Sequence, residues 1–147
     1  MPNFSKIPWI AAHIELYRTD PEKAHLWDST PVGGPGPLPT LLLTTKGRKT
    51  GALRSLPLIY GPAGKSYVVI ASKGGMPTHP LWYENLVAQP ECQIQVGAKR
   101  AAARARVAEG EERERLWKQM ATIYPPYLTY QKATQRTIPV VVLDPVG

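Results

Sequence analysis

The chain has 147 residues, of which 43% are hydrophobic and 20% charged, so one folded domain is predicted and a wholly disordered chain is excluded. The 18 Lys and Arg outnumber the 11 Asp and Glu, and the single cysteine, Cys92, excludes an intramolecular disulfide and favours a reducing compartment. No apolar run reaches the length of about 20 residues that a membrane-spanning helix needs, and the N-terminus lacks the apolar core of a signal peptide, so a cytoplasmic protein is expected.

The first half of the chain predicts a helix, a loop and three strands. Residues 1–28 are expected to be helical because apolar residues recur at steps of three and four, namely Ile7, Ile10, Ile14 and Tyr17. Four prolines and three glycines make residues 30–39 a loop. Strands are then predicted at 40–45, 54–60 and 65–72. Short turns join them, so they are expected to form an antiparallel meander in which Pro57 marks an edge or a bulge.

The second half predicts further strands and helices without a repeating strand–helix–strand pattern. In order these are a loop at 73–80, a helix at 81–89, strands at 93–96 and 100–108, a helix at 109–123 and a strand at 138–143. The helix at 109–123 has an apolar inner side formed by Leu116, Met120 and Ile123. Six strands with two or three helices therefore predict an α+β domain built on a small barrel.

Positive charge is concentrated in one part of the chain. No carboxylate lies between Asp28 and Glu84, whereas six cations do: Lys46, Arg48, Lys49, Arg54, Lys65 and Lys73. An anionic ligand would relieve the repulsion in this segment, and the alternative is a solvated basic face. At residues 45–54 the glycine-bounded turn, with Arg54 returning towards it, suits a phosphate bound by backbone N–H groups and guanidinium; the alternative is an ordinary basic hairpin.

Three other segments are candidates for contact with a ligand. At 71–75, two glycines would let a planar ligand approach the backbone while Ser72 and Lys73 donate hydrogen bonds, although a plain strand-ending turn has the same pattern. Trp82 and Asn85, one helical turn apart, would cover a ligand together, or Trp82 belongs to the core. Three tyrosines stiffened by two prolines would line a pocket with hydroxyls that orient a substrate carbonyl or nitro group; the alternative is aromatic packing with solvent-facing tips. These are Tyr124, Tyr127 and Tyr130.

Several kinds of chemistry have no support in the sequence. His13, His25 and His79 lack metal-ligand spacing, so no metal site is predicted. The order of residues in a phosphate-binding P-loop, the Gly-x-Ser-x-Gly motif and paired carboxylates are all missing. A bound organic cofactor is therefore expected to carry any difficult reaction.

Over about residues 38–143, these motifs follow the order found in one family. They are Thr-Lys-Gly-Arg-Lys-Thr-Gly, Leu-Pro-Leu, Ala-Ser-Lys-Gly-Gly, Pro-Leu-Trp-Tyr-x-Asn-Leu, Tyr-Pro-x-Tyr-x-x-Tyr-Gln and Thr-Ile-Pro-Val. In this order the chain resembles the deazaflavin-dependent nitroreductases, the A branch of the flavin/deazaflavin oxidoreductases known from actinobacteria. The resemblance implies a split β-barrel that binds coenzyme F420, a deazaflavin with a phosphate and a polyglutamate tail.

The resemblance also implies a residue set for each part of the site. The phosphate and acidic tail would be held by Arg48, Lys49, Thr50 and Arg54. The ring would lie along Leu56, Pro57, Leu58 and Ile59, and its edge would meet Ile70, Ala71, Ser72 and Lys73, with Trp82 and Asn85 closing the site. The substrate pocket and catalysis would fall to Ser72, Tyr124, Tyr127 and Tyr130, with Tyr127 also beside the cofactor.

The expected function is hydride transfer from reduced F420 to a quinone, an enone or lactone, or a nitroaromatic compound. The alternatives are an FMN-dependent reductase of the same fold and a basic nucleic-acid-binding module, which is disfavoured because the basic segment has few aromatic residues before Tyr60. Residues 1–30 are treated as a helical segment ahead of a barrel domain at 31–147. This segment is expected to pack on the barrel, to cap the pocket or to touch a membrane surface.

Overall fold

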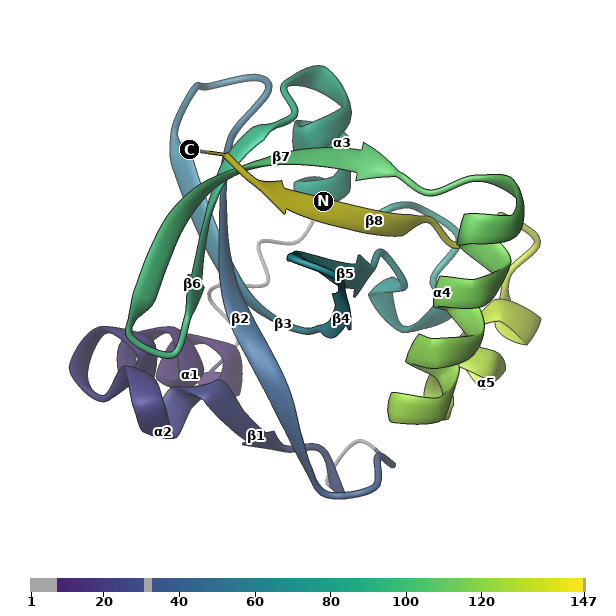
Figure 1. Ribbon diagram of the computed structural model, residues 1–147, viewed down its shortest axis with the longest axis horizontal. Helices are drawn as coiled ribbons and strands as arrows, with labels where there is room; N and C mark the ends of the chain where they lie inside the picture. Colours follow the sequence, from purple (N-terminus) through teal and green to yellow (C-terminus); the bar gives the residue numbers. More distant parts are fainter. Residues whose placement is uncertain (1–7, 31–32, 147) are drawn as a thin grey trace.

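A curled antiparallel sheet forms the centre of the molecule (Figure 1). The structure, a computed structural model, describes residues 8–30 and 33–146, and within them the sheet has eight strands. These are β1 (Leu26–Asp28), β2 (Pro37–Lys46), β3 (Leu53–Ile59), β4 (Gly61–Ala63), β5 (Ser66–Ile70), β6 (Glu91–Val96), β7 (Lys99–Val107) and β8 (Val140–Pro145). Their order is β1-β2-β6-β7-β8-β5-β4, with β3 also paired to β2.

The helices lie at two sides of this sheet. They are α1 (Pro8–Thr19), α2 (Pro21–His25), the short 3₁₀ turn η3 (Lys73–Gly75), α3 (Leu81–Ala88), α4 (Gly110–Ile123) and α5 (Pro126–Ala133). In Figure 1, α1 and α2 lie on one side of the sheet and α4 and α5 on the opposite side. Among the described residues, none of these helices combines the length and the apolar character needed to cross a membrane.

The N-terminal segment is less regular than predicted. In place of one helix over 1–28, the described part has α1, then α2, then β1; residues 1–7 of the predicted helix lie outside the described residues. The break occurs because Pro21 has no backbone N–H to continue α1 and instead starts α2, with Asp20 as its cap. The Asp20 carboxylate accepts a hydrogen bond of 3.3 Å from the Lys23 backbone N–H.

The predicted three-strand meander is wrong in its last pairing. β2 and β3 form the expected hairpin, in which Pro57 faces Leu42, and β3 is an edge strand as Pro57 indicates. β5, however, pairs with β4 and β8 and not with β3. The reason is that both faces of β5 are buried, so it occupies an interior position between two strands.

Two apolar cores explain why β5 and β8 read as continuous apolar runs. Val68, Ile70, Val140 and Val142 belong to a core closed by α4 and α5. The alternate residues of these two strands belong to a second core, and these are Val69, Val141 and Leu143. This second core also includes Trp82 and Leu86 of α3. The predicted inner side of α4 is confirmed, since Leu116 and Met120 are buried and Ile123 packs against the first core. The packing of β5 and β8 between these two cores fixes the strand ends that carry the candidate site.

Candidate active site

A cleft of about 380 Å³ opens where β3 and β5 end and α5 begins. It gathers predicted site residues from three segments that are distant in sequence. From β3 come Pro57, Leu58 and Ile59; from the end of β5 and the turn after it come Ile70, Ser72 and Lys73; and from the α4–α5 region come Tyr124, Tyr127 and Tyr130. The fold therefore brings together most of the residues expected around a deazaflavin ring and its acceptor.

The turn after β5 forms one wall of the cleft and leaves space beside its backbone. Lys73, Gly74 and Gly75 have φ angles of +47°, +63° and +80°, a left-handed run that side chains other than glycine seldom adopt. A Cβ on Gly74 would meet nothing within 4 Å, so this glycine leaves room towards the cleft. A Cβ on Gly75 would lie 2.7 Å from the Tyr130 carbonyl oxygen, so the absent side chain there lets the turn pack against α5.

The three tyrosines form one aromatic cluster. The rings of Tyr124 and Tyr127 meet edge to face with centroids 4.8 Å apart, and the hydroxyls of Tyr124 and Tyr130 lie 2.9 Å apart. Burial raises the pKa of Tyr124 and of Tyr127 well above the ordinary range, so both hydroxyls stay protonated at neutral pH. Because one hydroxyl of the Tyr124–Tyr130 pair donates to the other, the second O–H remains available to a ligand.

The glycine-bounded segment that joins β2 and β3, residues 45–54, is called the basic turn, and Asn85 holds it in place. The buried Asn85 amide accepts a hydrogen bond of 3.1 Å from the Arg48 backbone N–H and donates one of 3.1 Å to the Thr45 hydroxyl. Trp82 is buried in the second core, on the same helix. Neither residue lines the cleft, nor do Leu56 and Ala71, which also pack in the second core. The structure thus places Asn85 and Trp82 behind the turn.

The turn carries positive charge that the fold leaves largely unpaired. Arg48 lies 3.1 Å from Glu84, but within residues 8–30 and 33–146 neither Lys49 nor Arg54 forms an ion pair. Arg54 is opposite Thr45 in the hairpin register, and it lines a hollow with Ala11, Ile14 and Glu15 of α1. The Thr50 hydroxyl accepts a 3.2 Å hydrogen bond from the Ala52 N–H, and the N–H groups of Gly47 and Gly51 bond within the turn. The N–H groups of residues 47, 48, 51 and 52 are therefore engaged within the protein, and the side chains of Lys49 and Arg54 are available to an anion.

Five residues that line the cleft were not among the predicted site residues, namely Trp9, Ile10, His13, Trp27 and Thr40. His13 of α1 and Trp27 of β1 line the cleft, and Trp9 stacks on Trp27 with ring centroids 5.6 Å apart. The sequence analysis expected this segment to pack on the barrel, cap the pocket or touch a membrane, but the position of Trp27 depends on the pairing of β1 with β2, which no local pattern indicates. Gly74 also lines the cleft, where the double glycine at 74–75 had predicted a close approach to the backbone.

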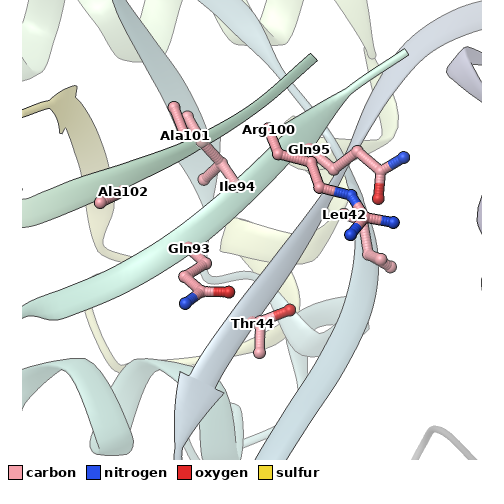
Figure 2. Close-up of a pocket in the computed structure, with 8 residues that line it drawn as sticks. All are labelled: Leu42, Thr44, Gln93, Ile94, Gln95, Arg100, Ala101 and Ala102. Atoms are coloured by element: carbon pink, nitrogen blue, oxygen red, sulfur yellow. The ribbon is translucent and has the colours of Figure 1, made fainter. Parts of the chain in front are cut away.

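A second hollow, of about 470 Å³, lies on the outer face of β2, β6 and β7 (Figure 2). Two of its polar side chains are already engaged, because Gln95 donates to the Gly97 carbonyl and the hydroxyl of Thr44 bonds to that of Ser55. It contains no predicted site residue; its lining is Leu42, Thr44, Gln93, Ile94, Gln95, Arg100, Ala101 and Ala102. The tyrosine-lined cleft is therefore the candidate active site.

The curled sheet with helices at its sides is a split barrel, as predicted. It is similar to a solved structure from Listeria innocua described as a pyridoxamine 5′-phosphate oxidase, with a TM-score of 0.52 and 14% identity over 74% of this chain and 84% of that one. The fold is therefore that of the split-barrel proteins, and its aromatic cleft and basic turn form the candidate cofactor site.

Sequence similarity identifies one particular family within this fold. The sequence model of the F420H2-dependent quinone reductase family matches residues 16–145, and the chain belongs to that family. It is 43% identical to an F420H2-dependent quinone reductase of Mycobacterium tuberculosis over 74% of this chain and 75% of that protein. It is also 44% identical to the solved F420H2-dependent reductase FDR-A, with a TM-score of 0.67 over 71% of this chain and 93% of that one. The predicted enzyme class and the cofactor F420 are confirmed: hydride passes from F420H2 to a quinone.

Proposed function

We propose that the tyrosine-lined cleft holds the quinone against the deazaflavin ring and that the basic turn holds the anionic tail of F420. One observation carries the proposal: three predicted segments, at 57–59, 70–73 and 124–130, converge on a single cleft of about 380 Å³. Two features support a fit to F420. Gly74 leaves space for a flat ring beside the backbone, and the unpaired cations Lys49 and Arg54 suit a phosphate and carboxylates.

Each group in the cleft has a separate role. Bound F420H2 supplies the hydride. The quinone oxygen gains negative charge as hydride arrives, and a protonated tyrosine hydroxyl of the Tyr124–Tyr130 pair stabilises that charge by hydrogen bonding. The proton then comes from this hydroxyl or from water. The Ser72 side chain makes no hydrogen bond that caps the η3 turn, so its hydroxyl is free to orient the reacting group.

The same groups would serve other electron-poor acceptors. An enone, a lactone and a nitroaromatic compound each develop negative charge on an oxygen during reduction, as a quinone does. The cleft offers hydroxyl donors on largely apolar walls, and this arrangement recognises an acceptor oxygen without selecting one ring system. We therefore include enones, lactones and nitroaromatics among the acceptors.

Replacing Tyr124, Tyr127 and Tyr130 singly by Phe tests their roles. Loss of one catalytic donor costs about 10²- to 10³-fold in rate where it stabilises the developing charge. We expect Tyr124→Phe or Tyr130→Phe to lower kcat for quinone reduction by about a hundredfold, the lower end of that range, with F420 binding unchanged. Tyr83→Phe, outside the cleft lining, is the control. If all three variants keep the wild-type kcat, these hydroxyls neither donate the proton nor stabilise the developing charge.

The N-terminal segment forms a cap over the cleft in this proposal. Ile10 and His13 of α1 and Trp27 of β1 contribute to the cleft wall, although they precede the barrel at 31–147. Trp9 also lines the cleft but remains 51% exposed, a position typical of an aromatic anchor at a membrane–water interface. We infer that this protein, predicted to be cytoplasmic, uses Trp9 to contact the membrane in which a lipophilic quinone resides.

The function is tested by a cofactor titration followed by an acceptor panel. Purified protein is titrated with F420 and, separately, with FMN, and F420H2 oxidation is then followed with quinones, enones and nitroaromatics. We expect saturable binding of F420, no tight binding of FMN and turnover with all three acceptor classes. Tight FMN binding without F420 binding would overturn the cofactor assignment, and turnover with quinones alone would remove the other acceptors.

The membrane contact is tested with uncharged phosphatidylcholine vesicles. These vesicles avoid the non-specific attraction that a net charge of +7 would produce. We expect Trp9→Ala to reduce the fraction of protein that pellets with them, whereas Val87→Ala, which removes a 65% exposed apolar side chain on α3, leaves it unchanged. Equal pelleting of the wild type and Trp9→Ala would end the membrane proposal.

A further inference from the structure

Arg136, which follows α5, bonds to several groups of the turn that forms one wall of the cleft. Its guanidinium donates to three backbone carbonyls: from Nε to Met76 at 2.9 Å, from Nη1 to Ala71 at 3.2 Å and from Nη2 to Ser72 at 2.7 Å. Nη1 also lies 3.0 Å from Nδ1 of His79. A single side chain thus contacts both ends of the 71–76 turn.

This turn depends on support from outside itself. Its backbone has three successive positive φ angles at residues 73–75, and two backbone hydrogen bonds lie within it, from Gly75 N–H to Ser72 and from Met76 N–H to Lys73. β5 ends at Ile70, and beyond it the Ala71 N–H donates a 3.0 Å hydrogen bond to the Pro139 carbonyl, next to the start of β8. The planar fork of Arg presents several donors in fixed directions, whereas a lysine ammonium cannot reach all of these acceptors at once.

Arg136 is itself fixed to α5, the helix that carries Tyr127 and Tyr130. The Gln131 side chain donates a 2.8 Å hydrogen bond to the Arg136 carbonyl and accepts one of 3.0 Å from the Ile138 N–H. On the other side of the same junction, Gly75 packs directly against the Tyr130 backbone. The turn with Ser72 and the helix with the tyrosines are therefore joined by Arg136 and by the direct packing of Gly75 on α5.

We propose that Arg136 is a positioning residue that sets the distance between the cofactor-facing turn at 71–76 and the tyrosines of the acceptor pocket. The proposal rests on the proposed function of the cleft. Arg136 does not line the cleft, so it acts through Ser72 and its neighbours and makes no contact with the acceptor.

His79 provides supporting geometry. Partial burial, and then the charge of Arg136, lower the pKa of His79, so its imidazole is neutral at pH 7 and Nδ1 can accept from the guanidinium. Burial also lowers the pKa of Arg136, but a guanidinium remains charged at every pH at which proteins fold. The contact thus joins a permanent donor to a neutral acceptor.

Arg136→Lys, with Arg113→Lys as a matched control, tests the proposal. Arg113 is also a partly buried arginine that donates to a backbone carbonyl, that of Ile138 at 2.8 Å, but it has no bond to the turn. We expect Arg136→Lys to raise the Kd for F420 and to lower kcat, each about tenfold, while Arg113→Lys changes neither. In the cofactor-free protein, amide hydrogen exchange at Gly75 and Met76 is expected to accelerate in Arg136→Lys alone.

The readouts separate this proposal from the proposed function. Unchanged exchange at Gly75 and Met76 in Arg136→Lys would overturn the positioning role, and so would equal effects of the two lysine variants on Kd and kcat. A wild-type protein that does not bind F420 would instead overturn the function assigned to the cleft. Faster exchange confined to Arg136→Lys, together with the changes in Kd and kcat, would support the proposal.

Discussion

Replacing Arg48, Lys49 and Arg54 together by Gln is expected to weaken F420 binding at least a hundredfold. A hydrogen bond to a charged group contributes about 1.5–3 kcal/mol, and even the lower value for two of the three residues exceeds a factor of one hundred. Lys49 and Arg54 should account for most of the loss, because Arg48 already lies 3.1 Å from Glu84. The Kd is measured by F420 fluorescence at low and high salt, and the difference between wild type and variant should shrink as salt screens the charges.

The control for this experiment removes the same charge elsewhere. Arg100, Arg115 and Lys118 are exposed, form no ion pair within the described part of the chain and lie outside the basic turn. Replacing all three by Gln also lowers the net charge by three, so a general electrostatic attraction to F420 would weaken equally in both triple variants. We expect the control to bind F420 within about threefold of wild type, well below the contribution of even one charged hydrogen bond. An equal loss in both variants would show that the turn is no specific anion site.

Local sequence patterns predicted much of the site because they fix local geometry. The glycines around Arg48 and Lys49 and the double glycine at 74–75 correctly indicated turns, since glycine is the residue that adopts positive φ without strain. Helical spacing likewise placed Trp82 and Asn85 on one face of α3. The spacing could not show what that face meets, and in the structure it meets the second core and the turn, not the cleft.

Long-range pairing was the part that the sequence did not reveal. The apolar run at 65–72 predicted a buried strand, but a run without alternation does not identify its partners, and β5 joins β8, more than seventy residues later. The same limit hid the cleft wall formed by Trp27, which depends on three residues of β1 pairing with Pro37–Pro39. Arg136 was missed because a single arginine in a loop has no pattern at all.

Gly75→Ala is expected to destabilise the protein by about 3 kcal/mol or more, because two separate costs combine. A positive φ costs an L-residue about 1–2 kcal/mol, and overpacking a tight site adds about 1–3 kcal/mol. Both apply here, since φ is +80° and the new Cβ would lie 2.7 Å and 2.9 Å from the Tyr130 carbonyl oxygen and Cα. These are backbone atoms of α5, so no side chain can rotate away to make room. The free energy of unfolding is measured by urea denaturation.

Gly64→Ala and Gly74→Ala separate the two costs. These glycines have φ angles of +62° and +63°, but a Cβ on either would meet nothing within 4 Å, so only the backbone cost of about 1–2 kcal/mol applies. If Gly75→Ala loses no more stability than these two variants, the close packing of the turn on α5 is not a significant constraint. If its loss is larger, as expected, the turn at 71–76 and the tyrosine helix are held together by direct backbone contact as well as by Arg136, and their separation is fixed before any ligand binds.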